Sequence, residues 1–161
     1  MRFLQVLALL LAGAIVNPSH AQSIPSGVNT PMLPPPPSLR GNVVHIPTSG
    51  SDQTFAVQAA INSAGPGDTI FFDQGGHIVC GGITYKAGQL YIGPSISFPL
   101  LGQNGRATID GCNGSGQFTA ASNTTTYGLN FTNIAPWNIF GTTGVTLRNT
   151  NIDQSGTRAE I

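Results

Sequence analysis

The sequence predicts an all-β fold in which short strands stack as a solenoid, with one helix at the N-terminal end. Charged residues make up only 7% of the chain, while Gly is abundant with 21 residues. That composition is typical of strands joined by tight turns and unlike a helical bundle. One helix-like segment is stopped by Gly65-Pro66-Gly67, and only short β-like runs follow it. Two of these runs also repeat each other, as a solenoid requires.

Residues 1–21 are predicted to be a secretory signal peptide. Arg2 precedes the apolar run Phe3–Val16, and Ser19-His20-Ala21 forms a small-x-small cleavage site. The mature protein is therefore expected to be secreted, whether extracellular, periplasmic or held at the cell surface. No later segment is long and apolar enough to predict a membrane span.

The charge balance argues against nucleic acid as a partner. The chain has six basic and six acidic residues, and the basic residues form no cluster along the sequence. Nucleic-acid binding normally requires a basic patch, so we expect no nucleic-acid partner.

Residues 22–50 are predicted to be a Pro-rich linker or arm. The run Pro34–Pro37 favours an extended polyproline conformation. A spacer after the cleavage site is the favoured interpretation, and a docking motif for another protein is the alternative.

The next segment predicts the helix, from about Gln53 to Ala64. Its apolar residues fall near helical spacing, and Ser51 or Asp52 would cap its first turn. We expect Gly65 to close the helix in a left-handed conformation, because Pro66 forbids its continuation.

Eight short β-like runs follow the helix, separated by residues that favour turns. They are Thr69–Phe72, Gly82–Tyr85, Gln89–Gly93, Ser97–Gly102, Ala107–Gly111, Gln117–Ala121, Gly128–Ile134 and Val145–Ile152.

The last two runs match at an offset of 18 residues, which pairs Leu129 with Leu147 and Ile134 with Ile152. A solenoid stacks like residues on like in this way. Its first turn would expose an apolar bore and unpaired strand edges, which the helix is expected to cover. The run that begins at Thr69 would then start the stack.

The helix segment and the strand runs that follow it resemble a known protein family. Phe55–Phe72, "FAVQAAINSAGPGDTIFF", is similar to the N-terminal segment of secreted right-handed parallel β-helix proteins of the pectate-lyase-like superfamily. "ATIDG" and "GLNFTNI" are similar to the strands that follow in such proteins. The resemblance covers Asp52 to about Asp153. It implies that residues 51–161 hold the cap helix and first turns of a parallel β-helix, predicted to be incomplete at its C-terminal end.

The resemblance also implies a chemistry, because lyases of this fold use an arginine base and acidic residues that hold calcium. Arg148 lies on the last predicted strand, and Asp110 and Asp153 lie at strand ends. These three are the catalytic candidates, although the acidic residues are scattered along the chain and calcium needs several oxygen ligands in one place. Catalytic residues and metal ligands therefore stay unassigned. Calcium is expected from the resemblance alone, and no other cofactor is evident.

A hydrolase is disfavoured relative to a lyase. The stretch "NTNID", Asn149–Asp153, is similar to the Asn-Thr-Asp motif of polygalacturonases. However, Asn151 occupies the position of the catalytic acid, and an amide cannot exchange a proton there. His45 falls in the predicted arm and His77 in an early turn, and neither has a Ser or Cys partner that suggests a nucleophilic pair.

The two cysteines, Cys80 and Cys112, are a candidate disulfide. Export would permit the bond, and two separate buried thiols are the alternative. Two cysteines without C-x-x-C spacing supply too few ligands for a metal site.

The leading hypothesis is a secreted pectate-lyase-like protein that acts on or binds extracellular polysaccharide. The alternative is a non-catalytic adhesive or structural module of a cell surface or matrix. In both cases an open C-terminal end of the stack, with Leu147 at its mouth, is expected to favour self-association.

Overall fold

Parallel strands arranged in successive layers make up the described part of the chain, which is residues 35–95 and 99–153 of the computed structural model. The chain divides into two units, Met1–Met32 and Leu33–Ile161, and the described residues belong to the second. The predicted signal peptide lies outside the described residues.

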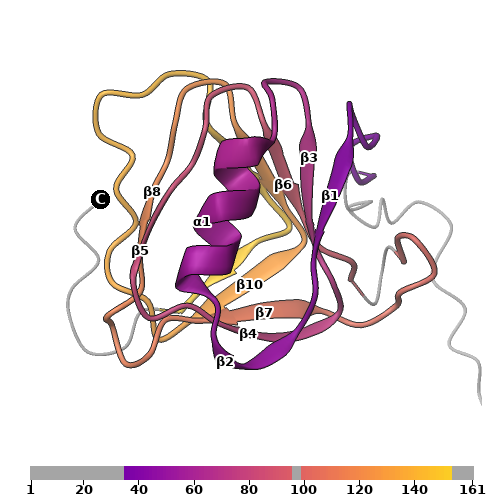
Figure 1. Ribbon diagram of the computed structural model, residues 1–161. Coiled ribbons are helices and arrows are strands. Elements are labelled where there is room, and N and C mark those ends of the chain that lie inside the picture. Colours follow the sequence, from indigo (N-terminus) through magenta and orange to yellow (C-terminus); the bar gives the residue numbers. More distant parts are fainter. Residues whose placement is uncertain (1–34, 96–98, 154–161) are drawn as a thin grey trace, which may run out of the picture. The chain divides into compact units, whose positions relative to one another are not determined.

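Three parallel sheets contain all the described strands (Figure 1). The first sheet has the order β1-β3-β6-β9-β11, with strands Val43–Ile46, Thr69–Phe72, Leu90–Ile92, Thr125–Tyr127 and Thr146–Arg148. The second has the order β2-β4-β7-β10-β12, with strands Ser49–Asp52, Gly75–Ile78, Ala107–Asp110, Leu129–Thr132 and Asn151–Ile152. The third pairs β5 with β8, which are Gly82–Thr84 and Gln117–Thr119.

The chain visits the sheets in turn, so each passage forms one layer. The layers are β1-β2, then β3-β4-β5, then β6-β7-β8, then β9-β10 and finally β11-β12. Each strand pairs in the same direction with the corresponding strand of the next layer. Figure 1 shows this succession as the change of colour from indigo to yellow. The predictions of a mostly β fold with parallel strands and one helix are confirmed.

A single apolar core lies between the three sheets. Phe72 of the first sheet, Phe131 of the second and Phe118 of the third are all fully buried in it. The rings of Phe118 and Phe131 meet edge to face with centroids 5.1 Å apart, a favourable aromatic geometry. Trp137 packs against the same cluster, 4.7 Å from Phe131.

The middle strands of the first sheet are buried on both faces. All four residues of β3 and all three of β6 are buried. Phe71, Leu90 and Ile92 of these strands form a second apolar cluster with Tyr127 of β9, and the partly buried side chains of Leu39, Val43 and Leu100 pack against it. Two-sided burial explains why these strands are continuous apolar runs without alternation.

Helix α1, Thr54–Ser63, packs on the apolar core between the sheets, next to the first layers (Figure 1). Val57 and Ile61 are its buried residues. The side chain of Gln58 accepts a hydrogen bond of 2.7 Å from the backbone N–H of Thr84 in β5 and donates one of 3.0 Å to its carbonyl. No helix within the described residues is long and apolar enough to cross a membrane.

Both ends of α1 differ from the sequence prediction. Gln53 takes the N-cap position without a side-chain cap bond. The carboxylate of Asp52 instead accepts bonds from the amide and hydroxyl of Thr54, at 2.9 and 2.6 Å. The left-handed glycine is Gly67, with φ 88°. The prediction for Gly65 is wrong, because the proline that follows favours extended backbone at the preceding residue.

The strands begin before the helix, so the prediction that Thr69 starts the stack is wrong. Residues 43–46 form β1, which pairs along its whole length with β3, and residues 49–52 form β2. The predicted arm, residues 22–50, therefore ends before Val43. Ile46 is buried in the core, and this apolar contact fixes a segment whose many prolines had indicated a linker.

The predicted 18-residue repeat is also wrong. Asn130 of β10 lies opposite Asn151 of β12, an offset of 21 residues. Leu147 belongs to β11, which pairs with β9 in a different sheet. Asn149 has φ 50° and turns the chain from one sheet to the other, which splits the predicted run Val145–Ile152 into two strands. The match had therefore aligned strands of two different sheets.

Candidate functional site

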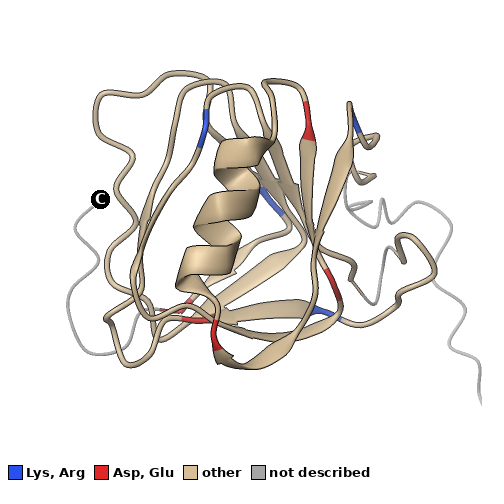
Figure 2. Cartoon of the chain, in the orientation of Figure 1, with Lys and Arg blue, Asp and Glu red and all other residues tan. Residues whose placement is uncertain are grey.

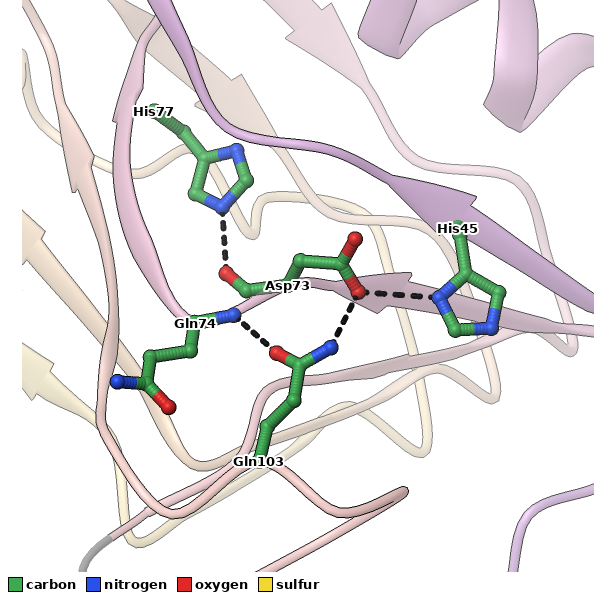
Figure 3. Close-up of polar contacts among 5 residues, drawn as sticks. All are labelled: His45, Asp73, Gln74, His77 and Gln103. Atoms are coloured by element: carbon green, nitrogen blue, oxygen red, sulfur yellow. Dashed lines mark hydrogen bonds and ion pairs between the residues drawn. The ribbon is translucent and has the colours of Figure 1, made fainter.

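Polar side chains from three successive layers meet where the chain passes from the first sheet to the second (Figure 3). Asp73 and Gln74 form the turn between β3 and β4, and His77 lies on β4. His45 lies on β1 in the preceding layer, and Gln103 lies in the connection between β6 and β7 in the following layer. We call this cluster of five residues the Asp73 corner.

The carboxylate of Asp73 is the centre of the cluster. Its Oδ1 accepts hydrogen bonds from Nδ1 of His45 at 3.0 Å and from Nε2 of Gln103 at 2.8 Å. The amide oxygen of Gln103 in turn accepts the backbone N–H of Gln74. These bonds tie together three layers and fix the carboxylate, while the side chains of His45 and Asp73 remain 48% and 26% exposed.

The corner keeps Asp73 ionised. Partial burial acts to raise the pKa of this carboxyl group, but the hydrogen bonds from His45 and Gln103, together with the electrostatic influence of the two histidines, outweigh burial. The net result is a pKa below the ordinary value of 3.8, so the corner carries a negative charge at neutral pH.

His77 holds the backbone of the corner from inside. Its side chain is fully buried, and its Nε2 donates a 2.8 Å hydrogen bond to the carbonyl oxygen of Asp73. Its Nδ1 lies 3.2 Å from the amide oxygen of Gln53. Burial lowers the pKa of His77 by more than the carbonyl and carboxylate of Asp73 raise it. His77 therefore acts as a neutral structural group.

The arrangement suits proton transfer and hydroxyl recognition. His45 is held through Nδ1 by a carboxylate, and its ring is half exposed, so Nε2 can meet a bound molecule. Carboxylate, amide and imidazole groups also pair well with hydroxyl groups. Among the hydrogen bonds of the described residues, none joins either histidine to a Ser hydroxyl or a Cys thiol.

The three catalytic candidates from the sequence do not form one group. Asp110 ends β7 and Asp153 follows β12, so both lie at the same end of the second sheet with β10 between them. Two strand spacings separate such positions by about 10 Å. Arg148 lies in the first sheet, where it pairs with Tyr127. The structure therefore brings the two acids to one sheet edge and places the arginine elsewhere.

Cys80 and Cys112 are joined by a disulfide, with Cα atoms 5.0 Å apart. Cys80 follows β4 and Cys112 follows β7, which are neighbours in the second sheet. The bond therefore links two successive layers at the end of the sheet opposite Asp73.

Charged side chains are dispersed over the described residues (Figure 2). Within residues 35–95 and 99–153, no three His, Cys, Asp or Glu side chains gather closely enough to hold a metal ion. Calcium therefore stays a prediction from the resemblance, without an assigned site.

Sequence analysis missed the Asp73 corner. His45 fell within the predicted arm, and Asp73 and Gln103 belong to no motif. The intervals between these residues, 28 from His45 to Asp73 and 30 from Asp73 to Gln103, match no constant repeat. The one usable signal was the alternation around His45 between Val44 and Ile46, which is typical of a strand.

Acidification is expected to destabilise the protein in two steps. The pKa of His77 lies below its ordinary value of 6.5, so the unfolded chain takes up a proton before the folded chain does. Stability is therefore lost as the pH falls below about 6.5. Asp73, whose pKa lies below 3.8, adds a second loss in stronger acid. Urea midpoints measured between about pH 7 and pH 5 would reveal the first step.

His77→Gln isolates the first step, because an amide can still donate to the carbonyl of Asp73 but does not titrate. We expect the midpoint of this variant to be nearly constant over the same range. An unchanged slope in His77→Gln would assign the loss to another group.

Comparisons of the chain with protein-family models, curated protein sequences and solved structures find no match. The Asp73 corner and the arrangement of the sheets are therefore the features that bear on function.

Proposed function

We propose that the chain is a secreted right-handed parallel β-helix protein that acts on or binds extracellular polysaccharide. Two features support the β-helix: the strands pair layer upon layer in parallel, and one apolar core lies between the three sheets. Crossover connections between parallel strands are right-handed in nearly all proteins, which supports that hand.

The main support for polysaccharide binding is the row of polar groups across three layers at the Asp73 corner. An extended polymer lying across successive strands would meet His45, Asp73 and Gln103 in turn, at intervals set by the strand spacing of about 4.8 Å. Sugar hydroxyls both donate and accept hydrogen bonds, so they can donate to the carboxylate of Asp73 and pair with the imidazole of His45 and the amide of Gln103. The side chains of His45 and Asp73 are 48% and 26% exposed, so a chain can reach the row from solvent.

In the lyase form of the proposal, His45 is the base. Its Nε2 would take the proton from the carbon beside a uronate carboxylate, the electron pair would form a carbon–carbon double bond, and the glycosidic oxygen would leave with a proton from water. Because Asp73 is negative, a uronate needs a cation between the two carboxylates, and calcium therefore belongs in the assay.

The non-catalytic module remains the second candidate. Arg148 lies in a different sheet from Asp110 and Asp153, so the lyase constellation of the resembled family is not assembled. If this candidate holds, Arg148→Ala leaves polysaccharide binding unchanged and no product accumulates.

The test uses the purified protein with polygalacturonate plus calcium and with a panel of neutral polysaccharides. Affinity electrophoresis reports binding, and ultraviolet absorbance reports unsaturated products. Asp73→Asn removes the charge while keeping the shape, and should weaken binding about 10- to 100-fold, the usual worth of a charged hydrogen bond. Asp153→Asn makes the same change at the other end of the second sheet and should bind like wild type.

Absence of product and of binding to every polysaccharide would overturn the proposed function. Loss of binding in Asp153→Asn with normal binding in Asp73→Asn would move the site to the opposite sheet edge.

A further inference from the structure

An arginine of the following layer, Arg106, is fixed beside the Asp73 corner. It directly precedes β7. The backbone N–H of Gly105 donates to the amide oxygen of Gln74 at 2.9 Å, and the carbonyl oxygen of Arg106 accepts the N–H of Gly75 at 3.0 Å. A side chain at position 105 would clash with Gln74, so glycine permits this close approach. The backbone of Arg106 is therefore tied to the turn that carries Asp73.

The side chain of Arg106 faces solvent. Along β7, the buried residues Ala107 and Ile109 alternate with Thr108 and Asp110, which are partly exposed. Arg106 is exposed, in line with the outward positions of this alternation. Within the part of the chain that the structure describes, its guanidinium makes no hydrogen bond and no ion pair. The corner therefore has beside it a positive charge that no described carboxylate neutralises.

Strand register brings this charge within reach of a molecule bound at the corner. Gly75 lies opposite Ala107 in the pairing of β4 with β7, so Arg106 lies level with Gln74, one strand spacing of about 4.8 Å away. Gln74 directly follows Asp73. An extended arginine side chain is longer than one such spacing. Arg106 and Asp73 nevertheless form no ion pair, so the guanidinium stays available to a second carboxylate.

The residues of the Asp73 corner do not fit a calcium site. Asp73 is the one carboxylate among the five (Figure 3), whereas calcium takes about six to eight oxygen ligands. Nowhere in the described part of the chain do three metal-ligating side chains gather at one point. A guanidinium, in contrast, presents its N–H groups as a planar fork that matches a carboxylate through two parallel hydrogen bonds. Arg106 therefore suits the carboxylate of a uronate better than the corner suits calcium.

We propose that Arg106 binds the carboxylate of a uronate unit at the Asp73 corner and is itself the cation that separates this carboxylate from Asp73. The site then selects acidic over neutral polysaccharide without calcium. A neutral sugar unit gains less from the guanidinium, because a hydrogen bond between a charged and a neutral group is weaker than one between two opposite charges. The inference rests on the proposed polysaccharide binding, and it adds the class of sugar and the residue that selects it.

Titration calorimetry in EDTA tests the inference with two probes, polygalacturonate and its neutral methyl ester. Wild type should bind the acidic probe more tightly. Arg106→Gln should weaken binding of that probe about 10-fold or more, the usual worth of a charged hydrogen bond, and leave the ester unchanged. Arg106→Lys keeps the charge without the planar fork and should lose less. Arg40→Gln is the matched control and should bind like wild type, because Arg40 is exposed and its backbone is bonded to Thr69 at the opposite end of β3.

Binding of polygalacturonate by wild type only when calcium is present would overturn the inference and leave the proposed function intact. Equal losses for both probes in Arg106→Gln would make Arg106 a structural residue. Equal losses in Arg106→Gln and Arg40→Gln would reduce the effect to net charge. Either result also overturns the inference alone. Failure of wild type to bind any polysaccharide, with or without calcium, would overturn the proposed function and this inference with it.

Discussion

Phe131→Ala is expected to lower the free energy of unfolding by about 3–5 kcal/mol, the usual cost of removing a buried phenyl ring. Phe131 is fully buried in the core between the sheets. Its ring lies 5.1 Å from Phe118 and 4.7 Å from Trp137, so both would lose an aromatic partner. Domains of this size are stable by only about 5–15 kcal/mol, so the variant should lose a large part of its stability.

Urea unfolding followed by tryptophan fluorescence measures this effect directly, because Trp137 packs on the deleted ring. Phe55→Ala is the matched control. Phe55 is 88% exposed on α1, and Ala has a higher helix propensity than Phe, so the control should change stability by less than about 0.5 kcal/mol. Equal losses in the two variants would mean that Phe131 does not lie in the core.

The sequence predicted correctly those elements whose pattern lies within one short segment. The helix was predicted close to its observed bounds, because its apolar spacing and the Gly-Pro-Gly stop lie within one segment. Strand β3 was predicted at Thr69–Phe72, its observed range, because a fully buried strand in a parallel sheet is a short unbroken apolar run.

Strands that depend on their neighbours were missed. β2 has the sequence SGSD and β4 has GGHI, and neither is rich in β-branched or aromatic residues. These segments are extended because each pairs with a parallel neighbour: β4 with β7 along its whole length, and β2 with β4 at Ser49 and Asp52 across a register shift. Strand propensity measures packing on a sheet rather than a backbone preference, so a segment with few large side chains gives little signal.

The candidate site was harder to predict than the fold. His45, Asp73 and Gln103 come from three layers whose connections differ in length, so their proximity follows from strand register. In the register of β1 and β3, His45 lies opposite Phe71, two residues before Asp73. The 18-residue match between the last two predicted runs gave no register for the three layers that hold these residues.

Loss of the Cys80–Cys112 disulfide is expected to lower the free energy of unfolding by about 3–4 kcal/mol. The bond closes a loop with a sequence separation of 32 residues, and the loop-entropy relation gives about 3.7 kcal/mol for that length. The bond joins the ends of β4 and β7, which pair directly in the second sheet. Its main action is therefore to restrict the unfolded chain, since backbone hydrogen bonds already hold the two layers together when folded.

Two independent routes remove the bond, and they should agree. Urea midpoints of wild type with and without reductant give one value, and the Cys80→Ser/Cys112→Ser variant gives the other. The double variant should be insensitive to reductant, which controls for effects of the reductant on other groups. If thiol titration shows complete reduction while the wild-type midpoint stays unchanged, the cross-link contributes no stability. In that case pairing between β4 and β7 must persist in the denatured ensemble and already restrict the loop.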